Sequence, residues 1–206
     1  MKKISLLLLA MTLFLSACGG YEADVTDNLS DDVKIEKDET DVLLASFLSG
    51  EIPAIYAEGE GDPFYITDLS IDEEDAFSYS VGDKVDLDND GELELILDGA
   101  YGGIYLDARA GQVYVLDEGW GTAGYLSYTV YEDKIWIVHC DTTHAGRYLY
   151  DLTLYDGTGN VADSFQLTQE FWETPDEPDG PNTVYTYRGE QITKEQYDAL
   201  KEQILP

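Results

Sequence analysis

The sequence predicts a mainly β (α+β) domain, an antiparallel β-meander with one helix before it and one helix after it. Three observations carry this prediction. Apolar residues alternate with a period of two through much of residues 79–187, which is typical of strands. Short Gly-, Asp- and Asn-containing turn signals separate these runs. Helical spacing of apolar residues is confined to two segments that flank the alternating region.

The alternating runs indicate which strands are buried. Leu93, Leu95 and Leu97 are expected on one face of a strand. Residues 135–138 are apolar without interruption, which favours a central strand that is buried on both faces. The turn signals that join the runs as hairpins are Ala110-Gly111, Glu132-Asp133, Asp156-Gly157 through Gly159-Asn160, and Arg188-Gly189. Their roughly regular spacing also allows blade-like repeated units.

The first helix is predicted just after residue 40. Leu43, Leu44 and Phe47 repeat at helical spacing, with Thr40 or Asp41 as the N-cap and Gly50 as the stop signal.

The second helix closes the chain. Thr193 and Gln196 have the spacing of a capping box, and Tyr197, Leu200 and Ile204 then form one apolar face. We expect this face to pack on the sheet.

The charge balance excludes two classes of function. The 206 residues contain 43 acidic and 11 basic side chains, for a net charge of −32. A nucleic-acid partner requires a basic face, as does electrostatic docking on anionic lipid, and neither is expected here. The chain is nevertheless 44% hydrophobic and has 16 Tyr, enough for one packed domain, which we place at residues 40–206.

The N-terminal residues have the features of a targeting signal. Lys2 and Lys3 precede the apolar run of residues 5–15, which is too short for a comfortable membrane span. The sequence Leu-Ser-Ala-Cys-Gly at residues 15–19 then resembles the lipobox of bacterial lipoproteins. An ordinary secretory signal with an incidental Cys is the alternative.

The lipobox resemblance implies a processed, anchored protein. Residues 1–17 would be a signal peptide, and Cys18 would carry a diacylglyceryl thioether with further acyl chains such as palmitate. Residues 18–39 are acidic and polar and are expected to form a flexible tether. The predicted location is therefore the extracytoplasmic face of the cell membrane, where the lipid is the membrane contact.

An Asp-rich segment carries the one chemically specific motif. Carboxylates at positions 1, 3 and 5 of a tight loop converge on one point, and a glycine at position 6 permits the turn. Position 7 supplies a backbone carbonyl, and position 9 ligates directly or through water. The predicted ligands are Asp86, Asp88, Asp90, the carbonyl of Glu92, and Glu94. Hard oxygen donors select one structural calcium ion, whereas the alternative is a solvated acidic turn.

The residues after the loop decide its type. Position 12 is Leu97, where an EF-hand requires an acidic ligand, and residues 92–98 alternate as a strand. The segment resembles the strand-flanked calcium loops of integrin-type (FG-GAP) and VCBS β-propeller repeats. Only one copy is present, so a complete propeller of such repeats is not supported.

A wider resemblance covers most of the chain after the lipobox. A helix ending in Phe-Leu-Ser-Gly-Glu-Ile-Pro-Ala (47–54), the Asp-rich loop, the hairpins and the closing Tyr-Arg-Gly-Glu-Gln-Ile-Thr (187–193) occur in that order. This order is similar to uncharacterised surface lipoproteins of Gram-positive gut bacteria, and it implies no established activity.

Other chemically suggestive residues give weaker signals. His139, Asp141 and His144 could place three ligands at a strand end, as an alternative site. Cys140 points to the opposite face from His139 and is expected to pack in the core with Trp136. Trp120 lies between two glycines and is the best candidate for an exposed aromatic residue.

The leading hypothesis is a lipid-anchored, calcium-binding surface domain that acts as a binding or surface-assembly module and not as an enzyme. Its partner would be an extracellular glycan or protein. The runner-up is an extracytoplasmic hydrolase of glycan or peptide, with Asp141 and either His139 or His144 near its site. A third hypothesis is a chaperone or inhibitor of another secreted protein.

Overall fold

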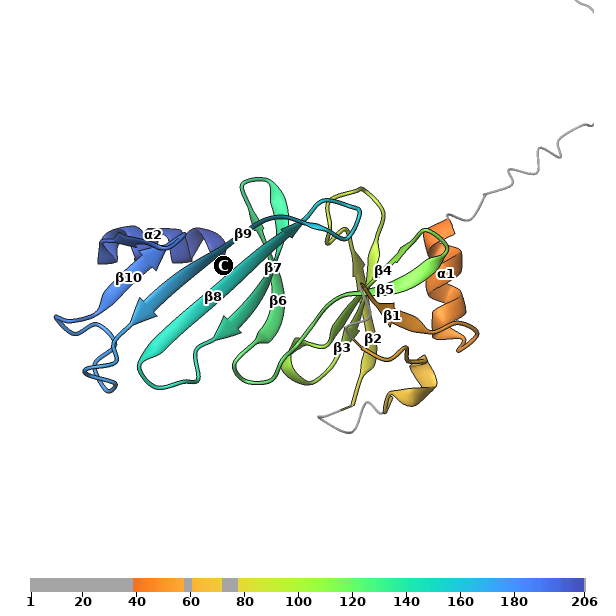
Figure 1. Ribbon diagram of the computed structural model, residues 1–206, viewed down its shortest axis with the longest axis horizontal. Helices are drawn as coiled ribbons and strands as arrows, with labels where there is room; N and C mark the ends of the chain where they lie inside the picture. Colours follow the sequence, from red (N-terminus) through yellow and green to blue (C-terminus); the bar gives the residue numbers. More distant parts are fainter. Residues whose placement is uncertain (1–38, 58–60, 72–77, 206) are drawn as a thin grey trace, which may run out of the picture. The chain divides into compact units, whose positions relative to one another are not determined.

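The computed structural model describes residues 39–57, 61–71 and 78–205. These residues form two β-sheets and two α-helices (Figure 1), so the predicted mainly β class with one helix at each end is confirmed. The helices are α1 (Glu39–Leu48) and α2 (Lys194–Ile204), with short 3-10 turns η2 (Ile66–Asp68) and η3 (Ala100–Gly102). The strands are β1 (Ala54–Tyr56), β2 (Ser80–Val85), β3 (Glu94–Asp98), β4 (Ile104–Arg109), β5 (Gln112–Glu118), β6 (Tyr125–Tyr131), β7 (Lys134–Asp141), β8 (Arg147–Tyr155), β9 (Val161–Glu170), β10 (Val184–Tyr187) and β11 (Glu190–Ile192).

The first sheet departs from a pure meander. Its order is β1-β5-β4-β3-β2, and β2 to β5 pair antiparallel in succession, as predicted. Strand β1, however, pairs parallel with β5, which is distant in sequence. Helix α1 contacts β4 and β5 and contributes Leu44 and Phe47, both fully buried, to the core on one face of this sheet.

The second sheet is an antiparallel meander in chain order, from β6 to β11. Helix α2 covers one of its faces (Figure 1) and buries Tyr197 and Ile204 in the core there. The predicted capping box is confirmed, since the Thr193 hydroxyl accepts from the Gln196 amide and the Gln196 side chain accepts from the Thr193 amide. Strand β7 is buried on both faces, with Trp136 in the core under α2 and Ile137 in a different core.

The predicted two-residue turns close the hairpins. The pairs Ala110-Gly111, Glu132-Asp133 and Arg188-Gly189 all have positive φ at both positions. This is the conformation of type I′ turns, whose twist matches that of the flanking strands.

Three details differ from the sequence predictions. Thr40 and Asp41 both lie inside α1, so neither is its N-cap, and the Thr40 hydroxyl donates to the Glu92 carboxylate and the Ala108 carbonyl. Leu93 is exposed and lies just before β3, which begins at Glu94. Blade-like units would be four-stranded sheets, whereas the described residues form sheets of five and six strands.

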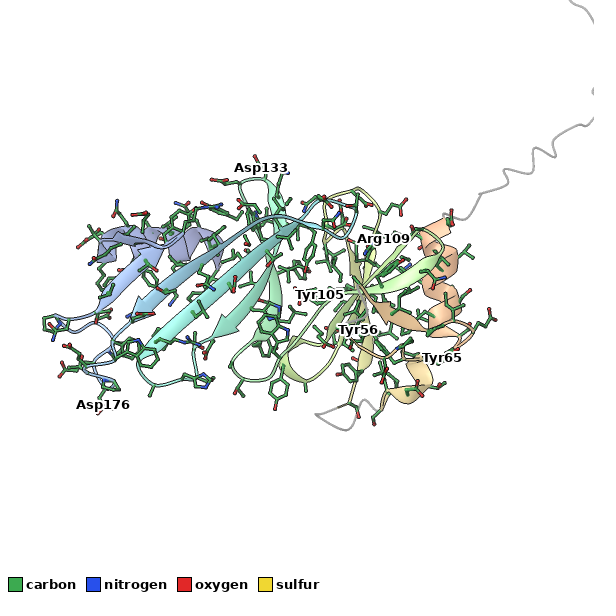
Figure 2. The ribbon with its side chains drawn as sticks, viewed as in Figure 1. Tyr56, Tyr65, Tyr105, Arg109, Asp133 and Asp176 are labelled. Atoms are coloured by element: carbon green, nitrogen blue, oxygen red, sulfur yellow. The ribbon has the colours of Figure 1, made fainter. Side chains whose placement is uncertain are left out.

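A third core joins the two sheets. It contains Leu87, before β3, together with Ile96, Tyr105 and Leu116 of the first sheet and Leu126 and Ile137 of the second. Tyr105, labelled in Figure 2, packs edge-on against Tyr128 of β6. Burial of these side chains from both sheets in one core is the main hydrophobic contribution to holding the sheets together.

Gly102 allows the chain to approach β6 closely, whereas Gly111 makes no such approach. Gly102, with φ of +96°, lies so near the backbone of Leu126 that an added Cβ would be 2.0 Å from the Leu126 carbonyl oxygen. Gly111 also has positive φ, of +76°, but has open space around the Cβ position.

These two glycines provide a matched test of the contact between the sheets. Gly111→Ala should cost about 1–2 kcal/mol of unfolding free energy, the strain of a left-handed Ala. Gly102→Ala adds a clash with backbone and should cost at least about 2 kcal/mol more. Urea unfolding of both variants measures the difference, and equal costs would contradict a close approach of η3 to β6.

Candidate metal centre

The Asp-rich segment forms the connection between β2 and β3. Asn89 and Gly91 have φ of 67° and 94°, which fold the chain back on itself. Side chains stabilise the turn, because Asp88 accepts from the Asp90 amide at 3.2 Å and Asp90 accepts from the Glu92 amide at 2.7 Å. Such Asx turns explain the Asp residues at positions 88 and 90.

The loop is attached to both sheets. Leu87 is fully buried in the core that joins them. The Asn89 side chain donates to the Ile135 carbonyl at 3.0 Å and accepts from the Ile135 amide at 2.8 Å, so it pairs with β7 as another strand would. The loop therefore connects two strands of the first sheet while it is hydrogen-bonded to the second.

Three carboxylates converge beneath this turn. Asp86, Asp88 and Glu94 each offer an oxygen, and these oxygens lie within 4.8 Å of one another. Asp88 and Glu94 are each only 1% exposed. Oxygens that bind one Ca²⁺ at 2.3–2.6 Å must lie within about 5 Å of one another, so the spacing fits that ion.

The hydrogen bonding of the three carboxylates is incomplete. Glu94 accepts from the amides of Leu87 and Asp88, the latter at 3.3 Å. Within the described residues, Asp86 Oδ1 and Asp88 Oδ2 are buried without a hydrogen-bond partner. A buried carboxylate oxygen without a donor is costly, and a hard cation would satisfy both oxygens at once.

Burial also shifts the protonation of the group. Burial, followed by the charges of Asp90 and Asp107, raises the pKa of Asp88 to about 6. Burial and the charge of Asp88 raise the pKa of Glu94 to about 8, although the amides of Leu87 and Asp88 act in the opposite direction. A bound cation would reverse this effect, because it stabilises the ionised forms.

The structure brings together three of the four predicted side-chain ligands. The Asp90 side chain is exposed, and one of its oxygens accepts the turn hydrogen bond, so Asp90 lies outside the group of three. The Glu92 carboxylate accepts from Thr40, which leaves only its carbonyl for the predicted role at position 7.

Sequence reasoning missed a fourth acid, Asp107 of β4. Asp107 is 4% exposed, its charge raises the pKa values of Asp88 and Glu94, and it pairs with Arg109. Burial raises its own pKa, and Arg109 opposes that effect. The signal was a lone Asp in an otherwise apolar stretch of strand (Ile-Tyr-Leu-Asp-Ala).

The residues of the alternative site, His139, Asp141 and His144, do not come together as one group. The His139 ring contacts Asp117 Oδ1 at 2.8 Å, whereas His144 contacts Asp141 at 2.8 Å and Arg147 donates to the same carboxylate at 3.0 Å. Among the described residues, the only three acidic, His or Cys side chains close enough to share a metal ion are those of the loop.

Asp141 of this alternative site and the adjacent Cys140 have structural roles. Although burial alone would raise it, hydrogen bonds from His144 and Arg147 hold the pKa of Asp141 at about 2. Cys140 packs against the core under α2 that contains Trp136, as predicted, and burial raises the pKa of its thiol. A protonated, half-buried thiol is a poor nucleophile.

Comparisons with known protein families, curated proteins and solved structures give no match to this chain. The arrangement of its own residues therefore carries the functional argument. The predicted signal peptide, Cys18 and the tether to residue 38 lie outside the described residues. No helix within the described ranges has the length and apolar character to cross a membrane.

The contact between His139 and Asp117 gives a pH-dependent prediction. Burial by itself would lower the pKa of His139, but the hydrogen bond and charge of Asp117 outweigh it and raise the pKa above 6.5. The pair should stabilise the fold fully below pH 6.5, and this contribution should be lost as the pH rises through the raised pKa.

NMR titration of the His139 ring measures this effect. In Asp117→Asn, burial should dominate and the pKa of His139 should fall below that of the unaltered protein. The imidazole of His144, which contacts a different carboxylate, is the internal control. An unchanged His139 pKa in Asp117→Asn would show that the pair does not form.

Proposed function

We propose that the chain is a lipid-anchored domain on the extracytoplasmic cell surface that binds one structural calcium ion and acts as a binding module. The convergence of Asp86, Asp88 and Glu94, with buried oxygens that lack donors, is the observation that supports calcium. The resemblance of residues 15–19 to a lipobox supports the anchor at Cys18.

The position of the loop gives the ion a structural role. In the loop, Leu87 packs in the core between the sheets, and Asn89 pairs with Ile135 of β7. A cation that neutralises the buried carboxylates would stabilise the loop and, through Asn89 and Leu87, the alignment of both sheets. The ion is therefore proposed to maintain the binding surface without taking part in chemistry.

The hydrolase alternative receives less support from the geometry. His139 Nε2 contacts Asp117, and Nδ1 contacts the Gly124 carbonyl at 3.4 Å. A general base needs a ring nitrogen free to take a proton, and both nitrogens of His139 face acceptors. Asp141 contacts His144 and Arg147, whereas His139 contacts Asp117, so the two histidines of this alternative contact different carboxylates and do not form one site.

Thermal unfolding with and without calcium tests the proposed ion. Extracellular calcium modules bind with dissociation constants of about 0.1–1 mM. For the tighter of these values, 10 mM calcium would add about 2.7 kcal/mol of stability. In a chain of this size that corresponds to a rise in Tm of roughly 5–10 °C.

Matched substitutions localise the effect. Asp88→Asn should abolish the calcium-dependent rise in Tm, whereas Asp176→Asn, at an exposed residue labelled in Figure 2, should retain it. No rise in the unaltered protein, or an equal rise in both variants, would contradict a calcium site in this loop.

A further inference from the structure

A pocket of about 390 Å³ opens where the two sheets meet, apart from the three loop carboxylates. It is lined from the first sheet by Tyr56 of β1 and Glu118 of β5. The second sheet contributes His139 of β7 and Asp151 of β8. The volume lies within the range of small-molecule sites, and the lining comes from strands rather than from loop tips alone.

Trp120 forms one wall of the pocket and is held in a fixed orientation. Its ring stacks on the His139 ring with centroids 3.8 Å apart and an angle of 18° between the planes. His139 is only 5% exposed and is fixed in turn by Asp117 and the Gly124 carbonyl. The Trp120 amide also donates to Gly124, at 3.0 Å, which closes the loop beneath the ring.

This anchored ring nevertheless remains open to solvent. Trp120 is 66% exposed, the largest fraction among the large hydrophobic side chains of the described residues. Because His139 covers one face of the ring, the exposed surface belongs mainly to the other face and the edges. The exposed Trp120 ring is not part of a core, and it offers a flat apolar stacking surface to a ligand in the pocket.

Two other lining residues, Glu118 and Asp151, offer hydrogen-bond acceptors. Glu118 accepts from the Tyr56 hydroxyl at 2.9 Å, and Asp151 accepts from the side-chain amide of Gln166 at 3.0 Å. Within the described residues each of these contacts uses one carboxylate oxygen, so a second oxygen on each side chain is available to a ligand donor. Hydroxyl groups are donors that match such acceptors.

The charges in the pocket restrict the ligand. Three carboxylates, of Asp117, Glu118 and Asp151, line it, and the net charge of the chain is −32, so an anionic ligand would be repelled. Asp117 is paired with His139, and Arg109 is paired with Asp107, so the carboxylates of Glu118 and Asp151 remain to accept from hydroxyl groups of a ligand. A neutral ligand with an apolar face and several hydroxyls fits best.

We propose that this pocket binds a neutral saccharide, with one pyranose ring stacked on Trp120 and its hydroxyls donating to Glu118 and Asp151. The C–H face of a pyranose is apolar and its edge carries hydroxyls, which matches a flat aromatic ring beside carboxylates. This deepens the proposed function, on which it rests, by naming the ligand class of the binding module.

Titration of the full chain in calcium-containing buffer tests the proposal. The probes are neutral oligomers of glucose, N-acetylglucosamine and mannose, with polygalacturonate as an anionic probe and spermine as a cationic probe. Calorimetry gives the affinity, and tryptophan fluorescence reports contact with the ring. At least one neutral oligomer should bind, and neither charged probe should bind more tightly.

The chain offers a matched pair of tryptophans as variant and control. Trp120→Ala should weaken saccharide binding about tenfold or more, as expected for an aromatic anchor. Trp172, also exposed at 55% but outside the pocket, should be replaceable by Ala with no effect. Glu118→Gln, which keeps an acceptor for Tyr56, should also weaken binding without lowering Tm.

Several results would overturn the proposal: no binding of any neutral oligomer, tighter binding of spermine or polygalacturonate, or equal binding by Trp120→Ala and the unaltered protein. Calcium-dependent Tm values for the same samples separate this failure from that of the ion site. A calcium-dependent Tm without saccharide binding overturns only the saccharide proposal. Saccharide binding without a calcium-dependent Tm overturns only the calcium site.

Discussion

The burial of Asp88 and Glu94 between two sheets is the constraint on which the rest of the structure depends. Two carboxylates that are 1% exposed, beside Asp86 and near Asp107, cannot all ionise in an apolar setting without compensation. The amides of the turn supply part of it. A hard cation would supply the remainder, so the same buried carboxylates that destabilise the loop on their own would bind the ion.

This constraint is coupled to the rest of the molecule through short, identifiable contacts. Leu87 lies in the core that joins the sheets, and Asn89 exchanges two hydrogen bonds with Ile135. Strand β7 also carries His139, which supports Trp120 at the wall of the pocket. The loop and the pocket therefore depend on the same alignment of the two sheets. A stabilised loop would keep the pocket preorganised, which lowers the entropic cost of binding a ligand.

Features set by neighbouring residues were predictable from the sequence, and features set by distant contacts were not. The capping box at Thr193, the turn at Ala110-Gly111 and the two-sided burial of residues 135–138 follow from local spacing, and the structure confirms them. The parallel pairing of β1 with β5 and the place of Thr40 inside α1 depend on tertiary contacts that no periodicity encodes. The same holds for the site. The convergence of Asp86, Asp88 and Glu94 was readable from the loop motif, whereas the approach of Asp107 and the pairing of His139 with Asp117 needed the assembled sheets.

The most direct measurement of the central claim is amide hydrogen exchange at Ile135, whose N–H donates to Asn89. If a cation fixes the loop between the sheets, calcium should slow exchange at Ile135 by more than at Tyr197, whose amide bonds within the C-terminal helix. Equal exchange at Ile135 with calcium and with chelator would contradict the account.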